Sequence, residues 1–92
     1  MNLPFGAATA AVLNITGLTA LRTSAAWVQQ INVLTAGAAG AIYDAAATGT
    51  ATAGRQIAVI PATIGMFPLN FPCTSGVVVA PGAGQSLAIT LA

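Results

Sequence analysis

The sequence contains no histidine, no lysine and no glutamate, and its charged side chains are two arginines and one aspartate. Acid–base catalysis by two carboxylates needs a pair of acidic residues, and a Ser–His or Cys–His nucleophile needs a histidine. A metal site needs several His, Cys, Asp or Glu ligands, and the chain offers Asp44 and Cys73. The composition therefore predicts a protein that is not an enzyme and that holds no metal or cofactor.

The shortage of charge also limits the partners. Charged residues make up 3% of the 92 residues and hydrophobic residues 57%, with a net charge of +1, whereas ordinary domains carry roughly 25% charged residues. Two arginines cannot neutralise the several phosphates that a nucleic acid presents, so no nucleic-acid partner is expected. So few charges protect a surface poorly against association, and we expect other chains to cover much of it.

The high apolar content does not predict a membrane segment. Residues 23–43 carry no charge, but Gln29, Gln30 and Asn32 interrupt this stretch. A membrane-spanning helix needs about 20 consecutive, predominantly apolar residues. No basic residue precedes the apolar part of the N-terminus, so a secretory signal is poorly supported as well.

The last third of the chain, residues 56–92, contains four short apolar runs that each end at proline or glycine. Such punctuation is typical of successive strands in a β-sandwich or barrel. In the run 66–72, Phe67, Leu69 and Phe71 fall on one face of an extended strand, and Met66, Pro68, Asn70 and Pro72 fall on the other. Pro68 and Pro72 in the same run lack N–H donors, which predicts a strand that is at the edge of its sheet or bent at these positions. The four runs are residues 56–61, 64–72, 76–85 and 86–92.

A longer candidate strand lies earlier, at residues 27–34, where Ile31 and Val33 share one face. The turn-forming residues 35–40 follow, and an apolar run resumes at residue 41. Residues 27–45 are therefore interpreted as a β-hairpin. In this interpretation the long strand and the last third of the chain each supply one half of the sandwich.

The N-terminal region is harder to read. Residues 1–6 are interpreted as an arm whose Phe5 contacts either a neighbouring chain or its own domain. Residues 12–16 alternate, which predicts a strand with Leu13 and Ile15 on the same face.

Residues 45–54 contain only alanine, threonine and glycine. We interpret them as a loop between strands. The alternative is an extended segment that presents Thr48, Thr50 and Thr52 in a row, as in surfaces that bind sugars or ice.

Together these patterns predict an all-β protein, a small antiparallel, jelly-roll-like β-sandwich formed by residues 7–92 after an arm at 1–6. Cys73 is either a small buried residue or the site of an intermolecular disulfide. Asp44 pairs either with an arginine of another chain or with solvent at a loop. The candidate interface residues are Phe5, Arg22, Asp44, Arg55, Pro68 and Pro72.

Five stretches carry a likeness to a known group of proteins. They are the strand at 33–37, the Tyr43-Asp44 pair that ends 41–44, the Ile-Pro strand end at 57–61, the Asn-Phe-Pro strand at 68–72 and the Pro-Gly turn within 76–85. Over residues 22–92 the chain resembles small structural proteins of tailed bacteriophages. The resemblance implies a compact sandwich that acts as a capsid decoration (cement) protein on the outer surface of the virion. It would bind the major capsid protein and stabilise the shell.

The same resemblance implies self-association as a homo-oligomer, a trimer or a dimer. It also leaves alternatives open. One is a module of a head or tail fibre that recognises the host. Another is a shell-forming or membrane-associated coat subunit, although the acidic end, apolar middle and basic end of helical coats are absent from this sequence.

Overall fold

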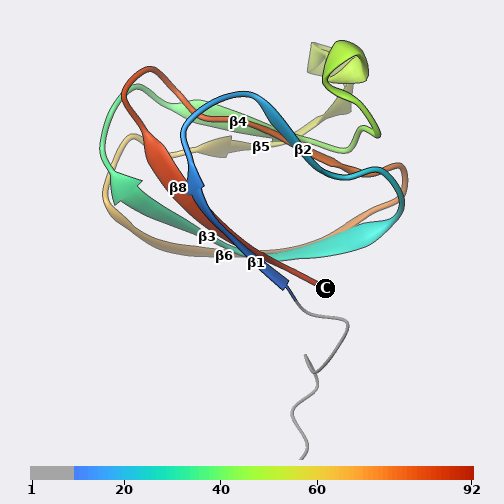
Figure 1. Ribbon diagram of the computed structural model, residues 1–92, viewed down its shortest axis with the longest axis horizontal. Helices are drawn as coiled ribbons and strands as arrows, with labels where there is room; N and C mark the ends of the chain where they lie inside the picture. Colours follow the sequence, from blue (N-terminus) through green and yellow to red (C-terminus); the bar gives the residue numbers. More distant parts are fainter. Residues whose placement is uncertain (1–9) are drawn as a thin grey trace, which may run out of the picture.

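Eight strands in residues 10–92, the part of the chain that the computed structural model describes, form two antiparallel sheets of four strands each (Figure 1). The predicted arm at 1–6, including Phe5, lies outside the described residues. The strands are β1 (Ala10–Ile15), β2 (Thr19–Arg22), β3 (Ala26–Thr35), β4 (Gly40–Tyr43), β5 (Gln56–Ile60), β6 (Gly65–Cys73), β7 (Val77–Ala80) and β8 (Ser86–Leu91).

The strand order is β1-β8-β3-β6 in one sheet and β2-β7-β4-β5 in the other, which is the arrangement of a jelly roll. The predicted all-β sandwich is confirmed. Successive strands change sheet at every connection except β4 to β5. Residues 56–92 therefore do not form one half of the sandwich, because β5 and β7 lie in one sheet and β6 and β8 in the other.

The predicted hairpin over 27–45 is wrong, because β3 and β4 belong to different sheets. The connection between them crosses the sandwich, and packed sheets lie about 10 Å apart. It is held by a hydrogen bond from the Ala38 N–H to the Ala83 carbonyl oxygen, at 3.0 Å. A turn-forming sequence ends a strand, but it does not decide whether the next strand pairs beside it or opposite it.

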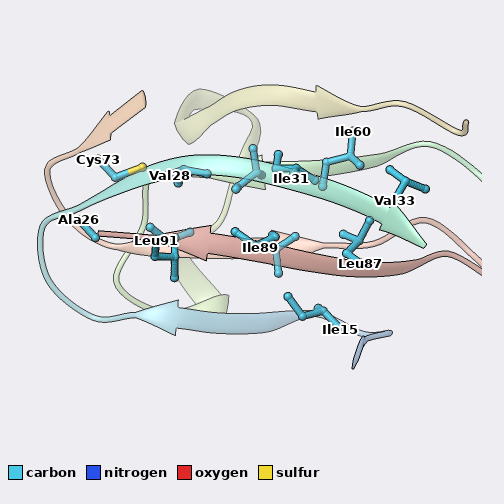
Figure 2. Close-up of a cluster of buried hydrophobic side chains, with 13 residues drawn as sticks. Ile15, Ala26, Val28, Ile31, Val33, Ile60, Cys73, Leu87, Ile89 and Leu91 are labelled. Atoms are coloured by element: carbon cyan, nitrogen blue, oxygen red, sulfur yellow. The ribbon is translucent and has the colours of Figure 1, made fainter. Parts of the chain in front are cut away.

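The core lies between the sheets and is filled by alternate residues of each strand (Figure 2). In β3 the inward side chains include Val28, Ile31 and Val33, which confirms the predicted face of this strand. The opposite sheet contributes, among others, Ile42 and Ile60, which are fully buried. Burial of each such side chain stabilises the fold by about 1.5–3 kcal/mol.

Strand β6 is an edge strand, as its prolines predicted. Phe67 and Leu69 pack against the core, while Pro68 and Pro72 lie exposed on the outer face. The predicted alternation is confirmed at Phe67 and Leu69 but not at Phe71, which is 36% exposed and follows a register shift where Asn70 adopts a positive φ of 52°.

Strand β1 exists as predicted, but its faces differ from the prediction. The register against β8 shifts between Val12 and Ile15, and Asn14 adopts a positive φ of 56°. This bulge moves Leu13 to the outer face, where it is 70% exposed, while Ile15 is buried.

The β4–β5 connection is a loop, as expected for residues 45–54. It contains two 3-10 turns, Thr48–Thr50 and Ala53–Arg55, and projects beyond the β2-β7-β4-β5 sheet in Figure 1. The extended threonine row is not formed, and the Thr50 hydroxyl donates to the Ala47 carbonyl oxygen at 3.0 Å. Among residues 10–92, no helix is long and apolar enough to cross a membrane.

One end of the sandwich is closed by close backbone contacts around Gln85. The Gln85 amide donates to the Pro61 carbonyl oxygen at 2.8 Å and accepts from the Gly82 N–H at 3.0 Å. Its side chain is 1% exposed, the one buried polar side chain in the described residues. The region formed by Gly37, Gly40, Gly82 and Gln85 is called the glycine end below.

Candidate functional site

At the opposite end of the sandwich, the three charged residues of the protein lie near a single turn, Thr74–Gly76, Asp44 and Arg55 through their side chains and Arg22 through its backbone. Arg22 ends β2, Asp44 follows β4 and Arg55 precedes β5. All three strands belong to the β2-β7-β4-β5 sheet. These three charged residues and the Thr74–Gly76 turn are called the charged end below, and they unite three of the predicted interface residues.

The Asp44 carboxylate holds this turn. One oxygen, Oδ1, accepts from the N–H groups of Ser75 at 2.8 Å and Gly76 at 3.3 Å. The other, Oδ2, accepts from the Thr74 N–H at 3.0 Å and the Thr74 hydroxyl at 3.2 Å. Hydrogen bonds to an ionised acceptor are stronger than neutral ones. Asp44 therefore joins β4 to the connection between β6 and β7.

These bonds also set the ionisation of Asp44. Partial burial acts to raise its pKa, but the bonds from the three backbone N–H groups and from the Thr74 hydroxyl act against it. The net effect lowers the pKa of the carboxyl from its usual value of 3.8. Asp44 is therefore an anion at neutral pH, fixed in place by the turn.

The two arginines make different contacts. The Arg55 guanidinium donates from Nη1 to the Ser75 hydroxyl oxygen at 3.2 Å, and the Asp44 N–H donates to the Arg55 carbonyl oxygen at 2.9 Å. The Arg22 guanidinium donates to the Leu21 carbonyl oxygen at 3.1 Å. The hydrogen bonds of the Asp44 carboxylate go to the turn, so an Arg–Asp pair between chains stays a prediction.

A hollow of about 210 Å³ lies beside these groups, lined by Asp44, Gly54, Arg55, Gln56 and Ile57. Because Arg55 is exposed, its guanidinium has further N–H donors available to a partner. The charged end is thus a polar surface with a fixed anion and an accessible cation.

Cys73, next to the turn, is a buried, unpaired residue with 3% of its surface exposed. Burial, together with the nearby Asp44 charge, raises the pKa of the thiol to about 11. The predicted role as a small buried residue is confirmed. An intermolecular disulfide would require the core to open at this position.

A second surface is the outer face of the β1-β8-β3-β6 sheet, which has no charged side chain among the described residues. Four large hydrophobic side chains are exposed on it, those of Leu13, Trp27, Leu34 and Met66. Leu13 and Met66 are the most exposed of the four, at 70% and 69%. The predicted interface residues Pro68 and Pro72 lie on it as well. This surface is called the uncharged face below and comprises Ala11, Leu13, Trp27, Gln30, Asn32, Leu34, Met66, Pro68, Pro72, Ala88 and Thr90.

No family model, curated protein or solved structure matches this chain. The function must therefore be argued from the two surfaces themselves.

Sequence reasoning named two residues of the uncharged face and missed its larger members. Trp27 and Leu34 are 50% and 52% exposed on the outer face of β3. The signal for them in the sequence was that two large hydrophobic residues occupy outward positions of this strand. Met66 was assigned to the outward face of β6, but its exposure depends on β6 being at the edge of the sheet. Leu13 was concealed by the bulge in β1.

The two surfaces meet at a second hollow of about 380 Å³, lined by Ala25, Ala26, Trp27, Pro72, Cys73, Thr74 and Ala92. Trp27 and Pro72 belong to the uncharged face, and Thr74 belongs to the charged end. A continuous surface therefore runs from the apolar face to the polar turn. Residues 10–92 contain no cluster of three His, Cys, Asp or Glu side chains.

Proposed function

We propose that this chain is a structural protein of a virus particle, a decoration (cement) protein that binds the outer surface of the capsid and stabilises the shell. The observation that carries the proposal is the uncharged face. Four large hydrophobic side chains are exposed on one sheet face, with no charge among them. A contiguous exposed surface of this kind is typical of an interaction site.

Two further features support a role in assembly. Only 3% of the residues are charged, which suits a chain whose surface is covered by other chains. The jelly roll is common among viral structural proteins, although a fold alone does not decide function. The particle and the position on it are proposed from the sequence resemblance to small phage structural proteins.

The charged end suits the contact with the shell. Asp44 is held rigidly by four hydrogen bonds, and Arg55 beside it is exposed. Charged groups held in one geometry contribute orientation and specificity more than affinity. Apolar burial at the uncharged face would supply affinity to the assembly, at about 25 cal/mol per Å² before the losses of association are subtracted.

The test is the copy number and the position of the chain in purified native particles. A decoration protein should be present in a fixed ratio to the major capsid protein and should appear on the outer shell in an electron-microscopy map. Particles lacking it should lose their genome at a lower temperature. A handful of copies at a fibre would contradict the proposal and would favour the alternative, a head- or tail-fibre module.

A further inference from the structure

The backbone register of the uncharged face places large and small side chains side by side. The outward residues of β3 are large, and the residues beside them on β8 are small. The neighbouring pairs are Asn32 with Ala88, Gln30 with Thr90, and Trp27 with Ala92. The two central strands thus form a ridge next to a shallow depression, with Leu13 and Met66 on the outer strands to either side (β1 and β6; Figure 1).

We propose that two copies of this chain pack their uncharged faces together about a two-fold axis that runs parallel to the strands, between β3 and β8. Rotation about such an axis leaves each residue at the same position along the strand direction. It places the β3 half of one uncharged face over the β8 half of the other. Gln30 would then lie over the partner's Thr90, and Asn32 over the partner's Ala88. The ridge of each copy enters the depression of the other, as an interface built from one repeated patch requires.

The same operation also pairs the outer strands. Leu13 lies on β1 in the row of Ala88, and Met66 lies on β6 in the row of Asn32. The axis therefore brings Met66 against the partner's Leu13. Both exposed side chains, about 70% accessible in the single chain, would be removed from water.

Charge favours a second copy as the occupant. In a two-fold interface each patch faces itself, so a charge near the axis meets its own copy and is repelled. The uncharged face carries none among the described residues, and Arg22, Asp44 and Arg55 belong to the other sheet. Homodimer interfaces are also more apolar than other protein surfaces.

The size of the face suits a stable dimer. Four strands about 4.8 Å apart, with the longest rising about 3.3 Å per residue, give a face of roughly 500–600 Å² in projection. Its side chains make the accessible area larger than the projection. A standard interface buries about 800 Å² per partner, so the face is of the required order.

The centre of the face is already ordered for docking. The Gln30 amide donates from Nε2 to the Asn32 Oδ1 at 2.9 Å and contacts the Met66 sulfur at 3.3 Å. The side-chain carbonyl oxygen of Gln30 is an acceptor, and the hydroxyl of the partner's Thr90 is a donor that could bond to it. Little side-chain freedom is then lost on association, which favours binding.

This inference rests on the proposed structural role, and it assigns the uncharged face to the contact between copies, which leaves the charged end for the contact with the shell. The experiment measures the mass of the isolated full chain by sedimentation velocity over a range of concentrations. The wild type should sediment as a dimer, and the emission of Trp27, the chain's single tryptophan, should shift to the blue as the dimer forms. A monomer at all concentrations, or a trimer, would overturn the proposal.

Two matched variants locate the interface. Met66→Lys places a charge on edge strand β6 within the uncharged face, and Val59→Lys places one on edge strand β5 of the other sheet. Their wild-type side chains are 69% and 63% exposed, so both variants should fold, as far-ultraviolet circular dichroism would check. Met66→Lys should weaken the dimer about 100-fold or more, and Val59→Lys should leave it unchanged.

Equal weakening by the two variants would place the contact elsewhere and contradict the proposal. If Met66→Lys fails to fold, Thr90→Lys, near the axis, replaces it with the same expectation. The outcomes also separate this inference from the proposed function. A dimer that does not bind capsids leaves the inference standing, whereas a monomer that decorates capsids leaves the function standing.

Discussion

At each end of the sandwich, one polar side chain holds a turn against the neighbouring strands. At the charged end, Asp44 accepts four hydrogen bonds from the Thr74–Gly76 turn and remains partly exposed. At the glycine end, Gln85 bonds to Pro61 and Gly82 and is 1% exposed.

The difference follows from the chemistry of the two groups. An amide carries a donor and an acceptor, so Gln85 can satisfy both within the protein and be buried without a charge. A carboxylate accepts only, and its charge is strongly unfavourable in the interior. The glycine end is therefore tightly closed and intolerant of change, while the charged end stays accessible to solvent and partners.

The largest expected effect is at the glycine end, from Gly82→Ala. A Cβ there would lie 2.0 Å from the Ala38 carbonyl oxygen and 2.4 Å from its carbon. These are backbone atoms, which cannot rotate away, so we expect a loss of about 3 kcal/mol or more in the free energy of unfolding. Denaturant unfolding monitored by circular dichroism measures it.

The matched control is Gly49→Ala in the β4–β5 loop, where a Cβ meets nothing within 4 Å. That variant should change the stability by less than about 0.5 kcal/mol. Equal midpoints for the two variants would show that the close approach at the glycine end does not constrain the fold.

A somewhat smaller effect is expected from Gln85→Glu, which puts a carboxylate in the buried amide site. The donor to the Pro61 carbonyl oxygen is lost and a charge is buried, so we expect a loss of about 2–3 kcal/mol at pH 7. Burial raises the pKa of the introduced carboxyl above its usual value of about 4.3. The additional destabilisation by the charge is therefore absent below that pH and grows as the pH rises.

The control for this variant is Gln85→Leu, which removes both hydrogen bonds without adding a charge. Its loss of stability should not change between pH 4 and pH 7. If Gln85→Glu shows the same flat profile, the site at Gln85 is open to water rather than closed.

Asp44→Asn should also cost most at neutral pH, with a loss of about 1–2 kcal/mol at pH 7, but for a different reason, because it removes a stabilising charge rather than adding a destabilising one. The folded-state pKa of Asp44 is lowered, so its stabilisation is present above the unfolded pKa and is lost as the pH falls through the folded pKa. The stabilities of the wild type and Asp44→Asn should therefore begin to converge as the pH falls below about 3.8 and should meet only below the lowered folded-state pKa. Chemical denaturation at several pH values measures this difference.

A pH-dependent difference between the two proteins can be assigned to Asp44, because it is the one side-chain carboxylate of the sequence and there is no histidine. The terminal carboxyl group is present in both proteins, so its titration cancels in the difference between their stabilities. Parallel curves for the two proteins over the acid range would contradict the role assigned to Asp44.

How much of this fold could be predicted from the sequence depends on the range of each interaction. The alternation of β3 and of β6 is local, so Ile31, Val33, Phe67 and Leu69 were assigned to the correct faces. The edge position of β6 followed from its prolines. The pairing of β3 with β8 is a long-range choice, and a turn sequence at residues 35–40 carries no information about it.

The same limit applies to the candidate site. Thr74, Ser75 and Gly76 form a turn, as their sequence indicates, but its anion lies thirty residues earlier and is brought there by the fold. The exposure of Leu13 depends on a bulge at Asn14, for which the alternation of residues 12–16 gave no sign. The sequence therefore predicted the turn itself, whereas the contacts between segments distant in the sequence could not be predicted from it.

The smallest expected effect on stability is that of Arg55→Ala at the charged end. The guanidinium makes a single exposed hydrogen bond to Ser75, at 3.2 Å, so its loss should change the free energy of unfolding by less than about 0.5 kcal/mol. Its effect on assembly distinguishes two roles. If Arg55 pairs with an aspartate of another chain, as the sequence suggested, the variant should form smaller oligomers at equal concentration. An unchanged oligomer size would limit Arg55 to the turn, and the charged end would then act in assembly through Asp44 and the backbone that it orders.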